Sequence, residues 1–236
     1  MTTTQTASSI NKTARLAGIL YLLMGPFAAY SLSVRFGAFI HEDASQTVAN
    51  IMAAQGSFMI AIVTWPVSQT LQIFLVLALY KILQPVNKAR AGLMVALALV
   101  GIPIVILNEL NQFAVLFLLS GKEYLASLPP EQVQAQVMFF LHMHEHGMQI
   151  AHIFWGLWLV PFGYLVFQSQ FLPKLLGALL IVAGCGYFID LAISWARPDL
   201  GVTVTQYTFI GELLLPLWLL AKGVNVEQWE RRALPA

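Results

Sequence analysis

Long apolar stretches recur along this 236-residue sequence, and each is long enough to cross a lipid bilayer as a helix. The hydrocarbon core of a bilayer requires about 20 mostly apolar helical residues. Segments of that kind occupy residues 16–34, 58–83, 91–119, 147–167, 175–195 and 207–221. The alternation of apolar and polar residues that marks the strands of a membrane barrel is missing from the sequence. The sequence therefore predicts an all-α polytopic membrane bundle of about six transmembrane helices, forming one domain over residues 1–236.

The composition agrees with this class and argues against others. Hydrophobic residues make up 58% of the chain and charged residues 10%, against about 25% charged residues in an ordinary soluble domain. The formal net charge of +1 supplies no basic field for nucleic acid, so we expect no nucleic-acid partner. The single cysteine, Cys185, permits neither an intrachain disulfide nor a set of several cysteine ligands.

The positive charges predict the orientation of the helices, because Lys and Arg are retained on the cytoplasmic side. Nine basic residues fall on one side of the predicted spans: Lys12, Arg15, Lys81, Lys88, Arg90, Lys174, Lys222, Arg231 and Arg232. Three fall on the other: Arg35, Lys122 and Arg197. We therefore expect both termini in the cytoplasm, and we expect residues 16–34 to be retained because five further spans follow them.

The two longer outer connections carry amphipathic stretches, at residues 45–55 and 131–141. An amphipathic helix can lie in the interface plane of a membrane. Alternatively, each stretch extends the helix that follows it outward from the bilayer. Both interpretations are open at the level of the sequence.

Four stretches resemble a known family: KTARLAGILY from Lys12 to Tyr21, LYKILQPVN from Leu79 to Asn87, FGYLVFQSQFLPKLLG from Phe162 to Gly177, and AGCGYFID from Ala183 to Asp190. Together they are similar to a bacterial family of multi-pass membrane proteins defined only as a domain of unknown function. The resemblance implies a multi-pass protein of the bacterial cell (inner) membrane. It implies no activity, ligand or catalytic residue.

Polar residues in and just before the predicted fourth span fall on one side of a helical wheel. At 100° per residue, His142, Glu145, His146, Gln149 and His152 share a stripe about 120° wide. His144 falls on the opposite side of the wheel. Ionisable residues at membrane depth are costly, about 2.5–3.5 kcal/mol on insertion scales, and usually face a partner or a water-filled cavity.

Other predicted spans also carry polar faces. In the third span these are Asn108, Asn111 and Gln112 with Glu109 at the edge; in the second, Trp65, Ser68, Gln69 and Gln72; in the fifth and sixth, Asp190 and Glu212. Given the predicted orientation, nearly all of them lie in the outer or middle part of their helices. The pattern predicts a polar cavity between helices, open toward the outside.

A divalent metal such as zinc is one candidate ligand of these residues. His142 and His146 are four residues apart, which presents two imidazoles on one helical face, with Glu145 beside them. A carboxylate from another helix would complete the site: Glu109, Asp190 or Glu212. His41, Glu42 and Asp43 are further candidates in the first outer connection. The alternative is that the histidines near residue 144 lie in interfacial water and bind no metal.

Three classes of function fit the sequence. The first is a binding or transport protein for a small polar or amphiphilic molecule, with Glu109, Asp190 or Glu212 coupling protons. The second is a metal-dependent intramembrane enzyme acting on a lipid-like substrate through His142, His146 and a carboxylate. The third is a structural or assembly protein that uses its polar residues only for packing. In each case the lipid bilayer is the expected partner.

Overall fold

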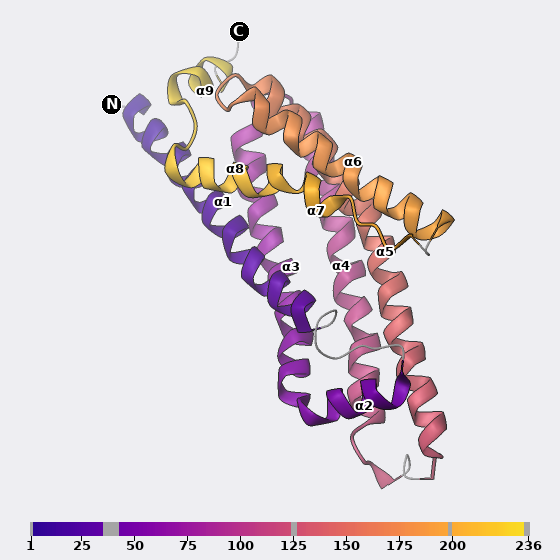
Figure 1. Ribbon diagram of the computed structural model, residues 1–236. Helices are drawn as coiled ribbons and strands as arrows, with labels where there is room; N and C mark the ends of the chain where they lie inside the picture. Colours follow the sequence, from indigo (N-terminus) through magenta and orange to yellow (C-terminus); the bar gives the residue numbers. More distant parts are fainter. Residues whose placement is uncertain (1, 35–42, 124–126, 198–199, 234–236) are drawn as a thin grey trace. The chain divides into compact units, whose positions relative to one another are not determined.

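The computed structural model describes residues 2–34, 43–123, 127–197 and 200–233. All regular structure in these residues is helical, without any strand (Figure 1). The helices are α1 (Thr2–Ser33), α2 (Ala44–Ala53), α3 (Gln55–Leu83), α4 (Lys88–Leu118), α5 (Pro130–Ser169), α6 (Lys174–Ala196), α7 (Thr205–Thr208), α8 (Ile210–Ala221) and α9 (Val226–Ala233). The prediction of an all-α fold is therefore confirmed over this part of the chain.

Four of these helices, α3, α4, α5 and α6, are long and apolar enough to cross a membrane. A fifth span is added if Thr205–Ala221 and Val226–Ala233, which are bent by 98° relative to each other, count as one. The chain is thus a helical membrane protein with four to five candidate spans among its described residues. Helix α1 coincides with the first predicted span but is not among these candidate spans. The count of six therefore stays a prediction.

The two amphipathic stretches have different outcomes. Residues 131–141 continue into the following helix, so α5 has 40 residues and a length of about 60 Å, twice the thickness of a bilayer's hydrocarbon core. The stretch 45–55 instead forms most of a separate ten-residue helix, α2. This second helix breaks at Ala54, which has φ −135° and ψ 42° and lies immediately before α3.

Helix α2 begins with a side-chain cap that the sequence encodes locally. The carboxylate of Asp43 accepts hydrogen bonds from the hydroxyl and backbone N–H of Ser45 and from the backbone N–H of Gln46. Such bonds satisfy donors that have no partner in the first turn of a helix. The same bonds, led by that of the Ser45 hydroxyl, hold the pKa of the exposed Asp43 carboxyl below its ordinary value.

The chain divides into two compact units. Unit 1 comprises Met1–Leu23, Leu71–Ile102 and Ala151–Ala236, and unit 2 comprises Met24–Thr70 and Pro103–Ile150. Several long helices run through both units, so each unit is assembled from segments that are distant in the sequence.

Unit 2 is held by an apolar core to which four of its helices contribute. Ile51 of α2 packs with Phe58 and Ile62 of α3, Val115 of α4 and Val137 of α5. All five side chains are almost completely buried. This core explains why α2 folds back onto the unit rather than lying free.

Unit 1 is held by close helix packing at glycines. A Cβ added at Gly177 of α6 would lie 2.4 Å from the backbone N of Phe167 and 2.6 Å from the carbonyl oxygen of Gly163, both on α5. A Cβ at Gly18 of α1 would lie 2.8 Å from the carbonyl oxygen of Pro216 on α8. Small residues at such crossings let helix backbones approach closely, which is how membrane helices gain van der Waals contact.

The segment around α9 is tied to the ends of other helices in unit 1. The indole N–H of Trp229 donates to the carbonyl oxygen of Ile82 at 2.8 Å, at the end of α3. The backbone N–H of Val224 donates to the side-chain oxygen of Asn11 in α1 at 2.9 Å. These bonds fix the turn between α8 and α9, and with it the position of α8.

Candidate functional site

A buried carboxylate–imidazole pair lies in unit 2. Nε2 of His144 on α5 is 3.1 Å from Oε1 of Glu109 on α4, and the two side chains are 6% and 1% exposed. An unpaired ionisable side chain is costly in such a place, and pairing removes most of that cost. His144, which the helical wheel placed opposite the polar stripe, is therefore a site residue that reasoning from the sequence missed.

Neighbouring amides fix the geometry of this pair. The side-chain N–H of Asn108 donates to the backbone oxygen of His144 at 2.7 Å, and Asn111 donates to the side-chain oxygen of Asn108 at 3.0 Å. Gly147 makes room for this contact, since a Cβ there would lie 2.0 Å from the same oxygen of Asn108. The crossing of α4 and α5 is thus specified by polar residues as well as by apolar packing.

Two buried acceptors in unit 2 remain unsatisfied. The side-chain oxygens of Gln69 and Gln112 are buried and have no hydrogen-bond partner among the described residues. Gln112 is one helical turn from Glu109 on α4, and residues three apart on a helix share a face. An orphaned acceptor beside the buried pair is suited to a donor group of a bound molecule.

The histidine stripe predicted on α5 is largely exposed. His142 lies 3.7 Å from Glu145, both more than half exposed, and Nδ1 of His146 lies 3.3 Å from the side-chain oxygen of Gln149. Among the described residues, no group of three or more His, Cys, Asp or Glu side chains is placed to hold a metal ion. His41 and Glu42 lie outside the described residues, and Asp43 caps α2.

A second polar cluster lies in unit 1, around Glu212 of α8. Its Oε2 accepts a hydrogen bond from the hydroxyl of Tyr21 on α1 at 3.0 Å. Its Oε1 accepts one from the hydroxyl of Tyr187 on α6 at 3.3 Å. All three residues are partly exposed. The two hydrogen bonds join the carboxylate of α8 to α1 and α6.

Aromatic rings surround the two tyrosines. The ring centroids of His152 and Trp155 on α5 lie 5.6 and 5.9 Å from that of Tyr187. The centroid of Trp158, also on α5, lies 6.4 Å from that of Tyr21. His152 thus belongs to an aromatic group next to Glu212 and not to the His142–Glu145 region of the same helix.

Two other predicted residues of unit 1 are placed differently. The carboxylate of Asp190 accepts hydrogen bonds from the backbone N–H groups of Val204 and Thr205 and from the hydroxyl of Thr205. It thereby anchors the start of α7 to α6, a structural role. Gln72 is 4% exposed.

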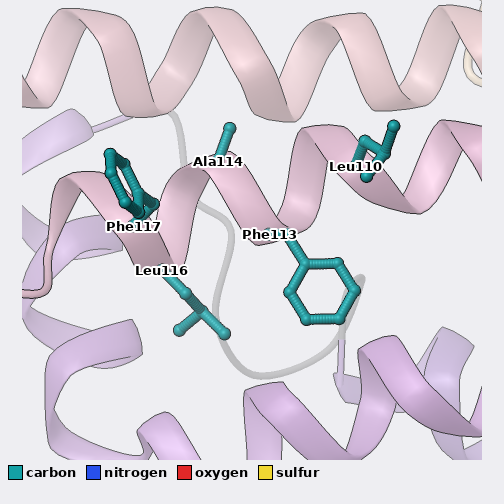
Figure 2. A pocket seen from close by; sticks show the side chains of 5 residues that line it. All are labelled: Leu110, Phe113, Ala114, Leu116 and Phe117. Carbon is teal, nitrogen blue, oxygen red and sulfur yellow. The ribbon is translucent and has the colours of Figure 1, made fainter.

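A surface groove of about 450 Å³ lies along α4 in unit 2, lined by Leu110, Phe113, Ala114, Leu116 and Phe117 (Figure 2). Its lining is apolar throughout, and none of the predicted site residues belongs to it. Exposed apolar side chains are the expected surface of a helix that faces lipid tails. The groove is therefore distinct from both polar clusters.

Comparison with known proteins places the chain in a family without assigning chemistry. An "Uncharacterized protein" of Archaeoglobus fulgidus is 37% identical over 81 residues, which cover 34% of this chain and 49% of that protein. The chain therefore matches about half the length of this curated relative. No solved structure matches it. Residues 16–223 match the family described as "Domain of unknown function (DUF4386)", and the chain belongs to that family.

Proposed function

We propose that this protein crosses the cell membrane six times with both termini in the cytoplasm, and that it binds and transports a small polar or amphiphilic molecule in exchange with protons. The excess of Lys and Arg on one side of the predicted spans supports this orientation. Helix α1, with 32 residues, is long enough to supply the remaining span.

The observation that carries the functional proposal is the buried Glu109–His144 pair. A carboxyl and an imidazole at 3.1 Å can hold one shared proton, with the pair electrically neutral, or release it and carry one negative charge. In the proposed cycle, a change in the access of this pair to water during transport loads and unloads that proton.

The neighbouring amides suit the binding of a polar molecule near this pair. The unsatisfied oxygen of Gln112 offers an acceptor one turn from Glu109. A ligand that donates a hydrogen bond there would lie close enough to respond to the charge of the carboxylate. Such coupling between a proton and a ligand is the basis of exchange transport.

The test is proton movement in vesicles that contain the full chain, a trapped pH-sensitive dye and a trapped mixture of small polar and amphiphilic molecules, because an exchanger moves protons only against a counter-substrate. Under an imposed potassium diffusion potential, we expect proton uptake above that of protein-free vesicles, and we expect Glu109→Gln to reduce the excess at least tenfold. Gln replaces the carboxylate with an amide of the same shape, so it removes the proton site while retaining a hydrogen bond to His144.

His142→Gln is the matched control, because it changes an exposed histidine on the same helix as His144. It is expected to leave proton uptake unchanged. Uptake that is the same in the wild type and in Glu109→Gln would refute the role of the pair. Well-folded wild-type protein without any uptake would favour a purely structural role.

A further inference from the structure

The carboxylate of Glu212 has the surroundings of a counterion and lacks a cationic partner among the described residues. Its two hydrogen-bond partners are the neutral hydroxyls of Tyr21 and Tyr187. No described Lys, Arg or His forms an ion pair with it. A carboxylate within membrane-spanning helices requires a compensating positive charge, which either a proton or a bound cation can supply.

The carboxylate also keeps unused capacity for a ligand. An ionised carboxylate has about four acceptor positions, and the two tyrosines use one on each oxygen. The residue as a whole is partly exposed. A ligand can therefore use the remaining acceptor positions without breaking either tyrosine bond.

The rings next to Glu212 favour an organic cation. The face of an aromatic ring attracts a cation within about 6 Å of its centroid. The ring centroid of Tyr187 lies 5.6 Å from that of His152 and 5.9 Å from that of Trp155, so an aromatic group adjoins the tyrosine that hydrogen-bonds the acid. Hydrogen bonding of the phenol to the carboxylate further enriches the electron density of the tyrosine ring.

The same geometry disfavours a bare metal ion. Among the described residues there is no set of three or more His, Cys, Asp or Glu side chains that could hold a metal. Calcium requires six to eight oxygen ligands and magnesium nearly ideal octahedral geometry. One carboxylate flanked by aromatic rings provides charge and apolar contact, which is the complement of an alkylammonium group.

We propose that Glu212, with the rings of Tyr21, Tyr187 and Trp155, forms a binding site for a monovalent organic cation of the alkylammonium class. The binding of this cation does not depend on the function proposed above. Glu212 supplies the opposite charge, the tyrosines fix its orientation, and the rings select apolar substituents on nitrogen.

The test is equilibrium binding to the purified full chain in a maltoside detergent, followed by tryptophan fluorescence and calorimetry. The probes are choline and benzyltrimethylammonium, each compared with its neutral carbon isostere, dimethylbutanol or neopentylbenzene. We expect each cation to bind at least tenfold more tightly than its isostere. Equal binding of cation and isostere would overturn the proposal. Failure of both cations to bind would also overturn it.

Variants distinguish the site from nonspecific binding. Glu212→Gln is expected to remove the preference for the cation, and Glu212→Asp to keep the preference with weaker binding, because the charge remains but moves. Tyr187→Phe retains the ring and loses the hydroxyl, so a decrease of several-fold is expected. A preference for the cation that survives in folded Glu212→Gln would overturn the assignment.

Glu109→Gln is the control that separates this inference from the proposed function. It removes the proton site of unit 2 and is expected to leave cation binding unchanged. Cation binding without proton uptake in vesicles would leave the site standing and refute proton exchange. Proton uptake that depends on Glu109, without cation binding, would leave exchange standing and refute this site.

Discussion

A close backbone contact between α5 and α6 in unit 1 makes a quantitative prediction for Gly177→Ala. The new Cβ would lie 2.4 Å from the backbone N of Phe167 and 2.6 Å from the carbonyl oxygen of Gly163. Non-bonded heavy atoms pack at about 3.5–4.0 Å. Both contacting atoms belong to the backbone, so α5 and α6 must separate by about 1 Å to accommodate the methyl group.

The expected cost follows from comparison with a glycine in open space. Overpacking a well-packed contact costs about 1–3 kcal/mol, while replacing Gly by Ala in a helix interior gains about 1 kcal/mol. A Cβ at Gly92 of α4, also in unit 1, meets nothing within 4 Å. Gly92→Ala should therefore show only the increase in the free energy of unfolding that comes from helix propensity. The free energies of the two variants should differ by the overpacking cost, about 1–3 kcal/mol.

The assay is unfolding of each purified variant in mixed micelles with increasing dodecyl sulfate, followed by circular dichroism. The free energy of unfolding of Gly177→Ala should fall below that of Gly92→Ala by about the overpacking cost, about 1–3 kcal/mol. Equal free energies in the two variants would show that α5 and α6 do not approach as closely as the structure has them.

Three further predictions concern hydrogen bonds. The lowered pKa of Asp43 means that its carboxylate stabilises α2 above the pKa of the unfolded chain and loses this effect as pH falls through the lower folded value. The protection of the α2 amides, measured relative to their intrinsic exchange rates, should fall over that range, and Asp43→Asn should abolish this pH dependence. Asp190→Asn removes an acceptor of Thr205 and should lower the free energy of unfolding by about 1–3 kcal/mol. Hydrogen exchange at the Thr205 amide should become faster, and an unchanged exchange rate would contradict the anchoring role. Trp229→Phe loses the bond to the Ile82 carbonyl and should cost about 1 kcal/mol in unfolding experiments, whereas an unchanged free energy would exclude a contribution from that bond.

The long apolar helices could be predicted from the sequence because hydropathy is a local signal. The predicted spans 58–83 and 175–195 correspond to α3 (Gln55–Leu83) and α6 (Lys174–Ala196). The predicted span 147–167 lies within α5, which begins at Pro130. Hydropathy locates the part of a helix that lipid can accept and does not reveal where an amphipathic helix begins.

The candidate sites depend on contacts that the sequence does not encode locally. His144 was missed because the stripe with most polar residues was expected to face inward, whereas that stripe is exposed and α4 packs against the other face. A signal was present: Val137 and Leu141, seven and three residues before His144, continue the same face and are buried. The sequence places Asn108 on a polar face of its helix. The close contact of its amide with Gly147 on another helix cannot be predicted from a helical wheel.

The hydrogen bond between Tyr21 and Glu212 joins residues 191 positions apart, which has a consequence for biosynthesis. Ribosomes add about 5–20 residues per second, so Tyr21 emerges on the order of 10–40 s before its acceptor does. During that interval its hydroxyl must bond to water, lipid or the insertion machinery, because an unpaired hydroxyl in hydrocarbon is costly. Unit 1 can close only after α8 has been made, so the packing of its first helix is completed by one of the last segments to be synthesised.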